Sequence, residues 1–444
     1  MTAGEYARFK RFAEAIAIDP DFRQRAAEDP ADAARSLGLA LSDPDSALEA
    51  AALVNTGVAV EAGDNPYAAE YLRRAAVVGS FVDEINSREA YQSQEMFLFA
   101  DAVRNRCRME NSVLRGHSNI RYFPLCFELS LGCSVHCPFC GLDAKPWSAD
   151  FRYTEENARL WREVLQSSLE LLGPIAGTAP CYLATEPLDN PDYERFLKDF
   201  AALLGNVPQT TTAVADREAE RLKSLMRFLG PDRLENRAAL RFTVRSRAQF
   251  YRMAALYSPE ELSGVELLAN NPESLNRYSA SGRVRKGKSG KDDPLAYSIC
   301  CIAGLRVNMV EKSIRFIEPE IPDDDYPLGL RVREERFFSD AESFRRAARE
   351  MTERWSVGTL PDDRSLAWNR HCEVRETADA ILFLGDAIGY RVPRNAYTEQ
   401  AVQLVKDGCT LSQIREQAGL PEAWRAGFDA MMNQLYLRGY LRLR

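Results

Sequence analysis

The most informative stretch of this sequence is Leu125-Cys-Phe-Glu-Leu-Ser-Leu-Gly-Cys133-Ser-Val-His-Cys137-Pro-Phe-Cys140. It begins with an apolar run typical of a buried strand, and a C-x3-C-x2-C spacing follows directly. Thiolates are soft ligands that suit iron–sulfur clusters or zinc, and a tight loop can direct three sulfurs at one centre. A four-iron cluster can leave one iron open, whereas a closed zinc site would also need His136 or a distant cysteine. The spacing favours an iron–sulfur cluster, with zinc as the alternative.

Around this stretch, residues 116–345 alternate between short apolar runs and helical stretches such as Glu155–Leu172 and Asp216–Phe228. Such alternation predicts an α/β fold built from parallel βα units. Six units would form a partial (β/α)6 barrel, with its chemistry at the carboxyl ends of the strands. The expected strands are Leu125–Leu131, Ala179–Ala184, Gln209–Ala215, Ala239–Val244, Gly264–Ala269 and Leu305–Val310.

Both flanks of this core have helical patterns. Residues 1–115 are alanine-rich, and the Asp19-Pro20 and Asp29-Pro30 pairs place proline where a first helical turn accepts it. Residues 346–396 form a post-barrel segment. Residues 397–444 predict three helices and a strand, a winged-helix-like unit that we expect to dock a peptide rather than DNA. Its middle helix begins with a capping box formed by Thr410 and Gln413. Its longest helix has an apolar stripe of Trp424, Phe428, Met431, Met432 and Leu435.

The composition limits the possible chemistry. Ten cysteines stand against three histidines in 444 residues, so sulfur is the more abundant reactive group. The absence of an apolar signal segment or a long apolar span predicts a cytoplasmic chain with no membrane partner, where cysteines serve metals or catalysis rather than disulfides. The net charge of -8 argues against binding nucleic acid over the whole surface. The basic stretch Gly282–Asp293 is most simply a solvated mobile loop, with substrate gripping as the alternative.

The cysteine loop resembles that of the radical S-adenosylmethionine (SAM) enzymes. The resemblance implies that Cys133, Cys137 and Cys140 hold one [4Fe-4S] cluster, that SAM chelates its open iron, and that Phe139 contacts the adenine. Ala184-Thr185-Glu186-Pro187 is similar to the Gly-Gly-Glu-Pro motif of these enzymes, which makes Glu186 the partner of the SAM ammonium; the two glycines are absent here. By the same resemblance, Arg245 and Ser246 would contact the SAM carboxylate and ribose.

Further segments are similar to the radical SAM epimerases that install D-residues in proteusin-type, ribosomally made peptides. They are Cys126-Phe-Glu-Leu-Ser-Leu-Gly-Cys133, Gly304-Leu-Arg-Val-Asn-Met-Val310, Tyr326-Pro-Leu-Gly-Leu330 and Arg333-Glu-Glu-Arg-Phe-Phe338. Residues 19–41 resemble a nitrile-hydratase-like leader peptide, with an ordinary helix pair as the alternative. The resemblance implies a leader-bearing precursor peptide and an external electron donor, such as flavodoxin or ferredoxin, as partners.

Epimerisation by this chemistry needs a thiol that returns hydrogen to the substrate α-carbon. Cys372 stands in the polar segment Trp368–Arg375, beyond the barrel, where the epimerases that this region resembles place their donor, and we expect it to be that thiol; Cys300-Cys301 is the reserve. Two alternatives remain. One is a radical SAM maturase that forms a crosslink, and the other is a zinc-bearing peptide-binding or regulatory protein.

Overall fold

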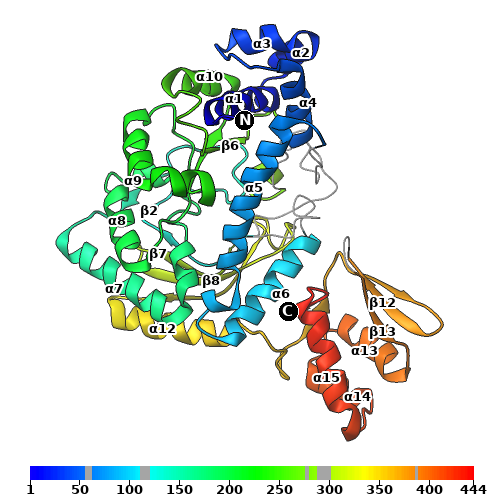
Figure 1. Ribbon diagram of the computed structural model, residues 1–444. Coiled ribbons are helices and arrows are strands. Elements are labelled where there is room, and N and C mark those ends of the chain that lie inside the picture. Colours follow the sequence, from blue (N-terminus) through cyan, green and yellow to red (C-terminus); the bar gives the residue numbers. More distant parts are fainter. Residues whose placement is uncertain (56–62, 111–120, 276–279, 288–301, 386–388) are drawn as a thin grey trace.

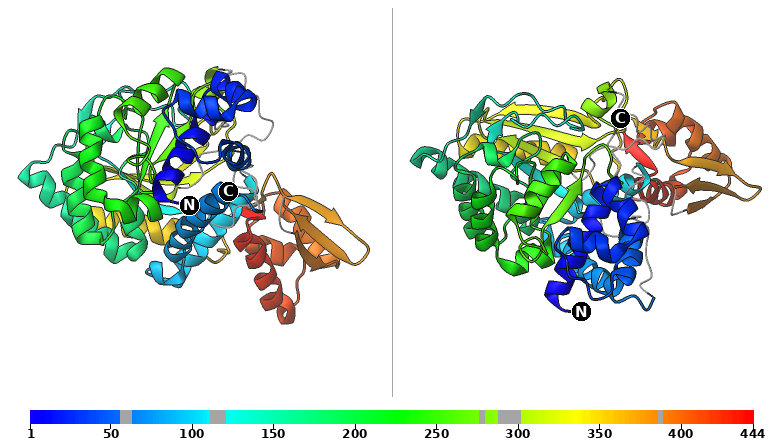
Figure 2. Two further views of the ribbon diagram at one scale, coloured as in Figure 1. Left: turned by 45° about the horizontal axis from the view of Figure 1, so that its top comes forward. Right: turned by 90° about the horizontal axis from the view of Figure 1, so that it is seen from above.

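The computed structural model describes residues 1–55, 63–110, 121–275, 280–287, 302–385 and 389–444. The fold is mixed α/β with several small sheets, and the described residues form no closed barrel (Figure 1). The chain begins with helices that pack beside the central strands and ends in a separate lobe (Figure 2). No helix in these ranges is both long and apolar enough to cross a membrane.

The N-terminal region is helical, as the sequence predicted. Asp19 and Asp29 cap α2 and α3, and each is followed by proline in the first helical turn. A carboxylate at this position accepts the free N–H groups of the helix, and proline has no N–H to leave unpaired. The helices are α1 Ala3–Ile18, α2 Pro20–Glu28, α3 Pro30–Ser36, α4 Pro44–Val54, α5 Pro66–Ile85 and α6 Gln94–Glu110.

The leader-like segment packs within the fold of its own chain. Asp19 is buried and accepts hydrogen bonds from Arg247 Nη1 at 3.0 Å and Tyr251 Oη at 2.6 Å, both on α10 (Arg247–Leu256). Arg11 of α1 donates to the Tyr257 carbonyl at 3.0 Å. These contacts fix the N-terminal helices against the central region, and both contribute to one apolar core.

The central region contains two sheets with parallel strand pairs. β1 (Phe123–Glu128) pairs in parallel with β7 (Ile302–Asn308), and the antiparallel strands β8 (Ser313–Pro319) and β9 (Leu330–Phe337) extend that sheet. The second sheet has three parallel strands: β4 (Thr210–Thr212), β5 (Leu240–Val244) and β6 (Glu266–Ala269). Helices lie on the outside of these strands in Figure 1: α7 Glu155–Leu172, α8 Tyr193–Leu204, α9 Ala219–Arg237 and α12 Ala341–Trp355.

The predicted strand Ala179–Ala184 is wrong, because this segment does not form a regular strand. Phe127 N donates to the Pro180 carbonyl at 2.9 Å, but Pro180 has no N–H to continue a ladder. The amide of Ala184 donates to the Glu128 side chain at 2.8 Å rather than to a strand carbonyl. The sixth expected strand, β7, pairs with β1, and in the described part of the chain it forms no ladder with β6.

The C-terminal unit is built on an apolar cluster that includes residues from Leu360 to Leu443, together with Ala102 and Met109 of α6. An antiparallel sheet of β11 (Glu373–Glu376), β12 (Ala380–Leu384) and β13 (Gly389–Pro393) precedes three helices. The predicted helices, the Thr410–Gln413 capping box and the final strand are confirmed. Trp424 departs from the predicted apolar stripe, since it is 56% exposed. The remaining elements are β10 Leu366–Trp368, α13 Ala396–Lys406, α14 Leu411–Gln417, α15 Glu422–Leu437 and β14 Leu441–Leu443.

Buried charges join this unit to the rest of the chain. Arg333 of β9 pairs with Glu318 at 2.8 Å and donates to the Leu443 carbonyl at 2.9 Å. Arg442 pairs with buried Glu320, and α15 packs against α6. The lobe in Figure 2 is therefore fixed to the central region along α6 and the β8–β9 hairpin.

Candidate functional site

The cysteine loop begins directly after β2 (Ser130–Leu131), which pairs with β3 (Ala149–Asp150). Gly132 has φ +82°, and a Cβ there would lie 2.1 Å from the Pro146 carbonyl oxygen, so only glycine fits. Cys133 N donates to the Lys145 carbonyl at 2.9 Å, and Cys140 N donates to the Cys137 carbonyl at 3.2 Å. These bonds hold the loop in a tight turn.

One cavity of about 250 Å³ brings together most of the predicted site residues. Its wall is formed by the cysteine loop, the segment that ends in Glu186, and the carboxyl ends of the parallel strands, where the chemistry was expected. The lining includes Cys133, Cys137, Phe139, Cys140, Tyr182, Thr185, Glu186, Thr212, Thr243 and Asn270.

The thiols in this cavity are half-buried, and their surroundings affect their ionisation. Burial raises the pKa of Cys137 to about 12, and nearby Cys133 and Cys140 add to the rise, while Arg245 opposes it. Burial also raises the pKa of Cys133. The free thiols of Cys133 and Cys137 therefore stay protonated near neutral pH, and binding a metal as thiolates would release their protons.

The cysteine loop supplies a donor set that fits a group with three protein ligands. The exposed His136 has Nδ1 3.5 Å from the Arg283 guanidinium, which does not favour it as a fourth ligand. Within the described ranges, no three His, Cys, Asp or Glu side chains are grouped tightly enough to hold a metal ion. The three sulfurs would have to turn toward a common centre, as soft ligands of an iron–sulfur cluster.

Glu186 is 3% exposed and belongs to the loop that ends the 179–184 segment. Its carboxylate accepts from Thr212 Oγ1 at 2.7 Å, Ala213 N at 2.9 Å and Leu188 N at 3.2 Å. Burial raises its pKa to about 7, although these three donors oppose the rise. A cation placed beside it would favour the charged carboxylate.

Arg245 and Ser246 follow β5, near the cavity but not among its lining residues. Arg245 is close enough to Cys137 to lower the pKa of its thiol, and among described residues its buried Nε has no hydrogen-bond partner. Ser246 is exposed and caps α10 by accepting from Gln249 N at 3.1 Å. Asn271, which follows β6, is buried and donates to the Ile18 carbonyl at 2.8 Å.

Several residues around the cavity had no assigned role in the sequence. Glu128, at the end of β1, is 1% exposed and accepts from Arg306 Nη2 at 2.9 Å as well as from Ala184 N. Ser134 N, inside the cysteine loop, donates to Asp189 at 2.8 Å. These bonds tie the Glu186 segment to β1 and to the cysteine loop. The signal in the sequence that could have identified Glu128 was a carboxylate inside the otherwise apolar expected strand Leu125–Leu131.

The prediction that the basic stretch 282–293 is simply a solvated loop is wrong at Arg283, which contacts the cysteine loop. Its guanidinium donates to the Cys137 carbonyl at 3.0 Å and pairs with Asp143 at 3.1 Å. The stretch contributes α11 (Arg283–Gly287), and residues 288–293 lie outside the described ranges. A contact between positions more than 140 residues apart leaves no signal in local sequence.

Cys372 lies apart from the cavity, in the turn before β11, and packs against the apolar cluster of the C-terminal unit. Burial raises the pKa of its thiol to about 12. Two residues earlier, Arg370 pairs with Asp323 at 2.6 Å, and the next residue, Asp324, bonds Arg285 at 2.5 Å. The turn is thereby connected to α11, beside the cysteine loop. The reserve donors Cys300 and Cys301 lie outside the described residues.

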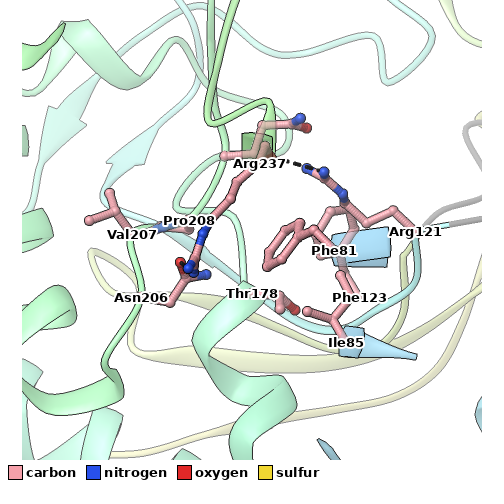
Figure 3. Close-up of a pocket in the computed structure, with 10 residues that line it drawn as sticks. Phe81, Ile85, Arg121, Phe123, Thr178, Asn206, Val207, Pro208 and Arg237 are labelled. Carbon is pink, nitrogen blue, oxygen red and sulfur yellow. Dashed lines mark hydrogen bonds between the residues drawn. The ribbon is translucent and has the colours of Figure 1, made fainter. Parts of the chain in front are cut away.

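The amino ends of the strands hold a much smaller pocket (Figure 3). Phe123, Pro208 and Arg237 line it, and Arg121 donates to the Arg237 carbonyl at 3.0 Å. Its volume of about 10 Å³ has room for about one water molecule. The larger cavity at the carboxyl ends is therefore the better candidate for binding.

Comparison with known proteins identifies a relative without an assigned activity. The chain is 35% identical over 326 residues to y4wI, an uncharacterized protein of Sinorhizobium fredii. The match covers 71% of this chain but 63% of that protein, so the chain spans less than two thirds of its relative. No protein-family model matches the sequence, and no solved structure matches it significantly.

Proposed function

We propose that this chain is a radical SAM peptide epimerase, which converts L- to D-residues in a ribosomally made precursor peptide. The observation that carries the proposal is the shared cavity of Cys133, Cys137, Cys140 and buried Glu186. The parallel strands β4, β5 and β6, and the parallel β1–β7 pair, support a partial radical SAM barrel as the scaffold.

In this proposal the cavity residues bind one [4Fe-4S] cluster and SAM. The three cysteines would ligate the cluster, and Glu186 would accept hydrogen bonds from the SAM ammonium, with Phe139 against the adenine. Arg245, whose Nε is buried without a partner in the described structure, suits the SAM carboxylate, and Ser246 the ribose. The bound cofactors would supply a 5'-deoxyadenosyl radical that takes the Cα hydrogen from the substrate.

Cys372 is the proposed donor of the returning hydrogen. Hydrogen-atom donation needs the protonated thiol, and a pKa raised to about 12 keeps Cys372 protonated near neutral pH. The substrate would have to extend from the cavity to the C-terminal unit to reach it. After donation, the Cys372 sulfur radical would return to the thiol by taking up one electron and one proton. In this proposal the external flavodoxin or ferredoxin supplies that electron.

The C-terminal unit offers a surface for the precursor. An open groove of about 490 Å³ lies between β13 and α15, lined by Tyr390, Val392, Tyr397, Trp424, Phe428 and Met431 among others. In the described structure β13 pairs with β12 alone, so its other edge is available to an added strand. An extended peptide could bond along that edge and place apolar side chains in the groove.

The decisive experiment is anaerobic reconstitution, followed by reaction in heavy water with a leader-bearing candidate precursor peptide from the neighbouring reading frames. We expect a [4Fe-4S] protein that cleaves SAM and leaves one solvent deuterium at each inverted α-carbon. Cys372→Ala should still cleave SAM but form no D-residue, whereas Cys300→Ala and Cys301→Ala, at the reserve donors, should still form it.

Other results would separate the alternatives. D-product without deuterium would exclude an exchangeable thiol donor. A product lighter by two hydrogens would indicate a crosslinking maturase, because epimerisation in ordinary water leaves the mass unchanged. A colourless protein that binds zinc and no iron would indicate the peptide-binding or regulatory alternative.

A further inference from the structure

Arg283 is bonded to the cysteine loop at several points, although 143 residues separate it from Cys140. Its backbone N donates to the Cys140 carbonyl at 2.9 Å, and Nη1 donates to the Cys137 carbonyl at 3.0 Å. Nη2 also donates to the Ala144 carbonyl, and Nε pairs with Asp143 at 3.1 Å. Two of the three cysteines thus have their carbonyl oxygens held by one residue, whose side chain is 21% exposed.

The preceding residue allows this close approach. Gly282 has φ +61°, and a Cβ there would lie 2.5 Å from the Cys140 carbonyl oxygen. Gly282 N in turn donates to the Pro327 carbonyl at 2.8 Å, which anchors the segment from its other side. The Gly282–Arg283 pair is therefore built into the fold as a clamp on the loop.

We propose that Arg283 is a positioning residue, which holds the backbone of the cysteine loop in place for its three sulfurs to turn toward a cluster, and which makes the bound cluster easier to reduce. The second half of this inference rests on the proposed function. A cluster with three thiolate ligands is anionic when reduced, and a neighbouring guanidinium stabilises the added negative charge. Asp143 partly offsets that charge. Removing Arg283 would leave the Asp143 carboxylate uncompensated beside the loop, and the reduction potential should fall.

The first measurement uses the full-length metal-free protein and follows alkylation of Cys133, Cys137 and Cys140 by mass spectrometry. We expect Cys137 and Cys140 to be alkylated about tenfold faster in Arg283→Gln. Losing hydrogen bonds from a charged group should raise the population of the open, reactive loop by at least that factor. Arg283→Lys should also react faster, since an ammonium cannot make all of these contacts. Arg285→Gln is the matched control, because Arg285 bonds Asp324 and the Pro322 carbonyl instead. Unchanged rates in Arg283→Gln would overturn the clamp.

The second measurement is the reduction potential of the reconstituted cluster, followed by electron paramagnetic resonance. We expect a lower potential in Arg283→Gln, a smaller change in Arg283→Lys, and a higher potential in Asp143→Asn. A loss of structure alone would not shift the reduction potentials of Arg283→Gln and Asp143→Asn in opposite directions. If the wild type and Arg283→Gln both bind the cluster and have equal reduction potentials, then Arg283 does not make the cluster easier to reduce, and that part of the proposal is overturned. A wild type that takes up no iron would instead contradict the proposed function, while the alkylation rates would still decide the clamp.

Discussion

The Glu186 carboxylate accepts a hydrogen bond from Thr212 Oγ1 at 2.7 Å, and both side chains are buried. The Ala213 amide donates to the same carboxylate at 2.9 Å. The end of β4 therefore orients the glutamate toward the cavity. In the motif that this segment resembles, two glycines precede the glutamate; here Ala184 and Thr185 stand in their place, and strand-end donors from β4 fix its position.

Glu186 should make stability depend on pH. Burial raises its pKa from 4.5 to about 7, so between these values the unfolded chain has lost the proton that the folded protein keeps. The free energy of unfolding should fall as pH rises from 5 to 7, by up to about 3 kcal/mol, and then level off. Glu186→Gln, which cannot ionise, should lack this slope. Urea unfolding of both metal-free proteins at several pH values would measure it, and parallel curves would contradict it.

Cys372 should resist alkylation at mildly alkaline pH. With a pKa of about 12, on the order of 0.1% of this thiol is ionised at pH 9, where an ordinary thiol is about half ionised. Iodoacetamide should therefore label it several-hundredfold more slowly in the native protein than in urea, as counted by mass spectrometry. The urea sample is the control. Rapid labelling of the native protein would mean that the thiol is an exposed thiolate, unsuited to hydrogen donation.

Local chemistry explains which parts of the fold the sequence could predict. The Asp19-Pro20 and Asp29-Pro30 helix starts and the Thr410 capping box depend on residues within one turn, and all three are present. The 179–184 segment failed as a strand because its neighbours are non-local: the Glu128 side chain takes the Ala184 amide that a ladder would use. The pairing of β7 with β1 likewise depends on tertiary packing.

The same division applies to the candidate site. The cysteine spacing and Glu186 were visible because each is a short motif, and the structure places them at one cavity. Arg283 was not visible, because a basic residue among glycines and serines has the composition of a solvated loop. Its contact with the Cys137 carbonyl exists only once the chain has folded.

Arg333 should contribute strongly to stability. Burial raises the pKa of Glu318, but Arg106 and Arg333 outweigh it, and the pKa is lowered. Arg333→Ala would weaken the compensation of a buried carboxylate, at a cost of about 3 kcal/mol. Arg391→Ala, which removes the exposed pair with Asp379, should cost less than about 1 kcal/mol. Denaturant unfolding of both variants would compare them, and equal losses would contradict the importance of the buried pair.

Trp424 should contribute to binding of the precursor leader but little to folding. Its ring is 56% exposed, lines the groove beside β13 and lies 5.6 Å from the Tyr397 ring. Exposed aromatic side chains of this kind often supply much of the binding energy, so Trp424→Ala should weaken leader binding by about tenfold while the melting temperature stays unchanged. Phe337→Ala is the control, since that ring is 68% exposed on β9, outside the groove. Calorimetric titration with the leader peptide would measure both affinities. If Trp424→Ala binds like wild type, the leader binds elsewhere, and the N-terminal helices become the next surface to test.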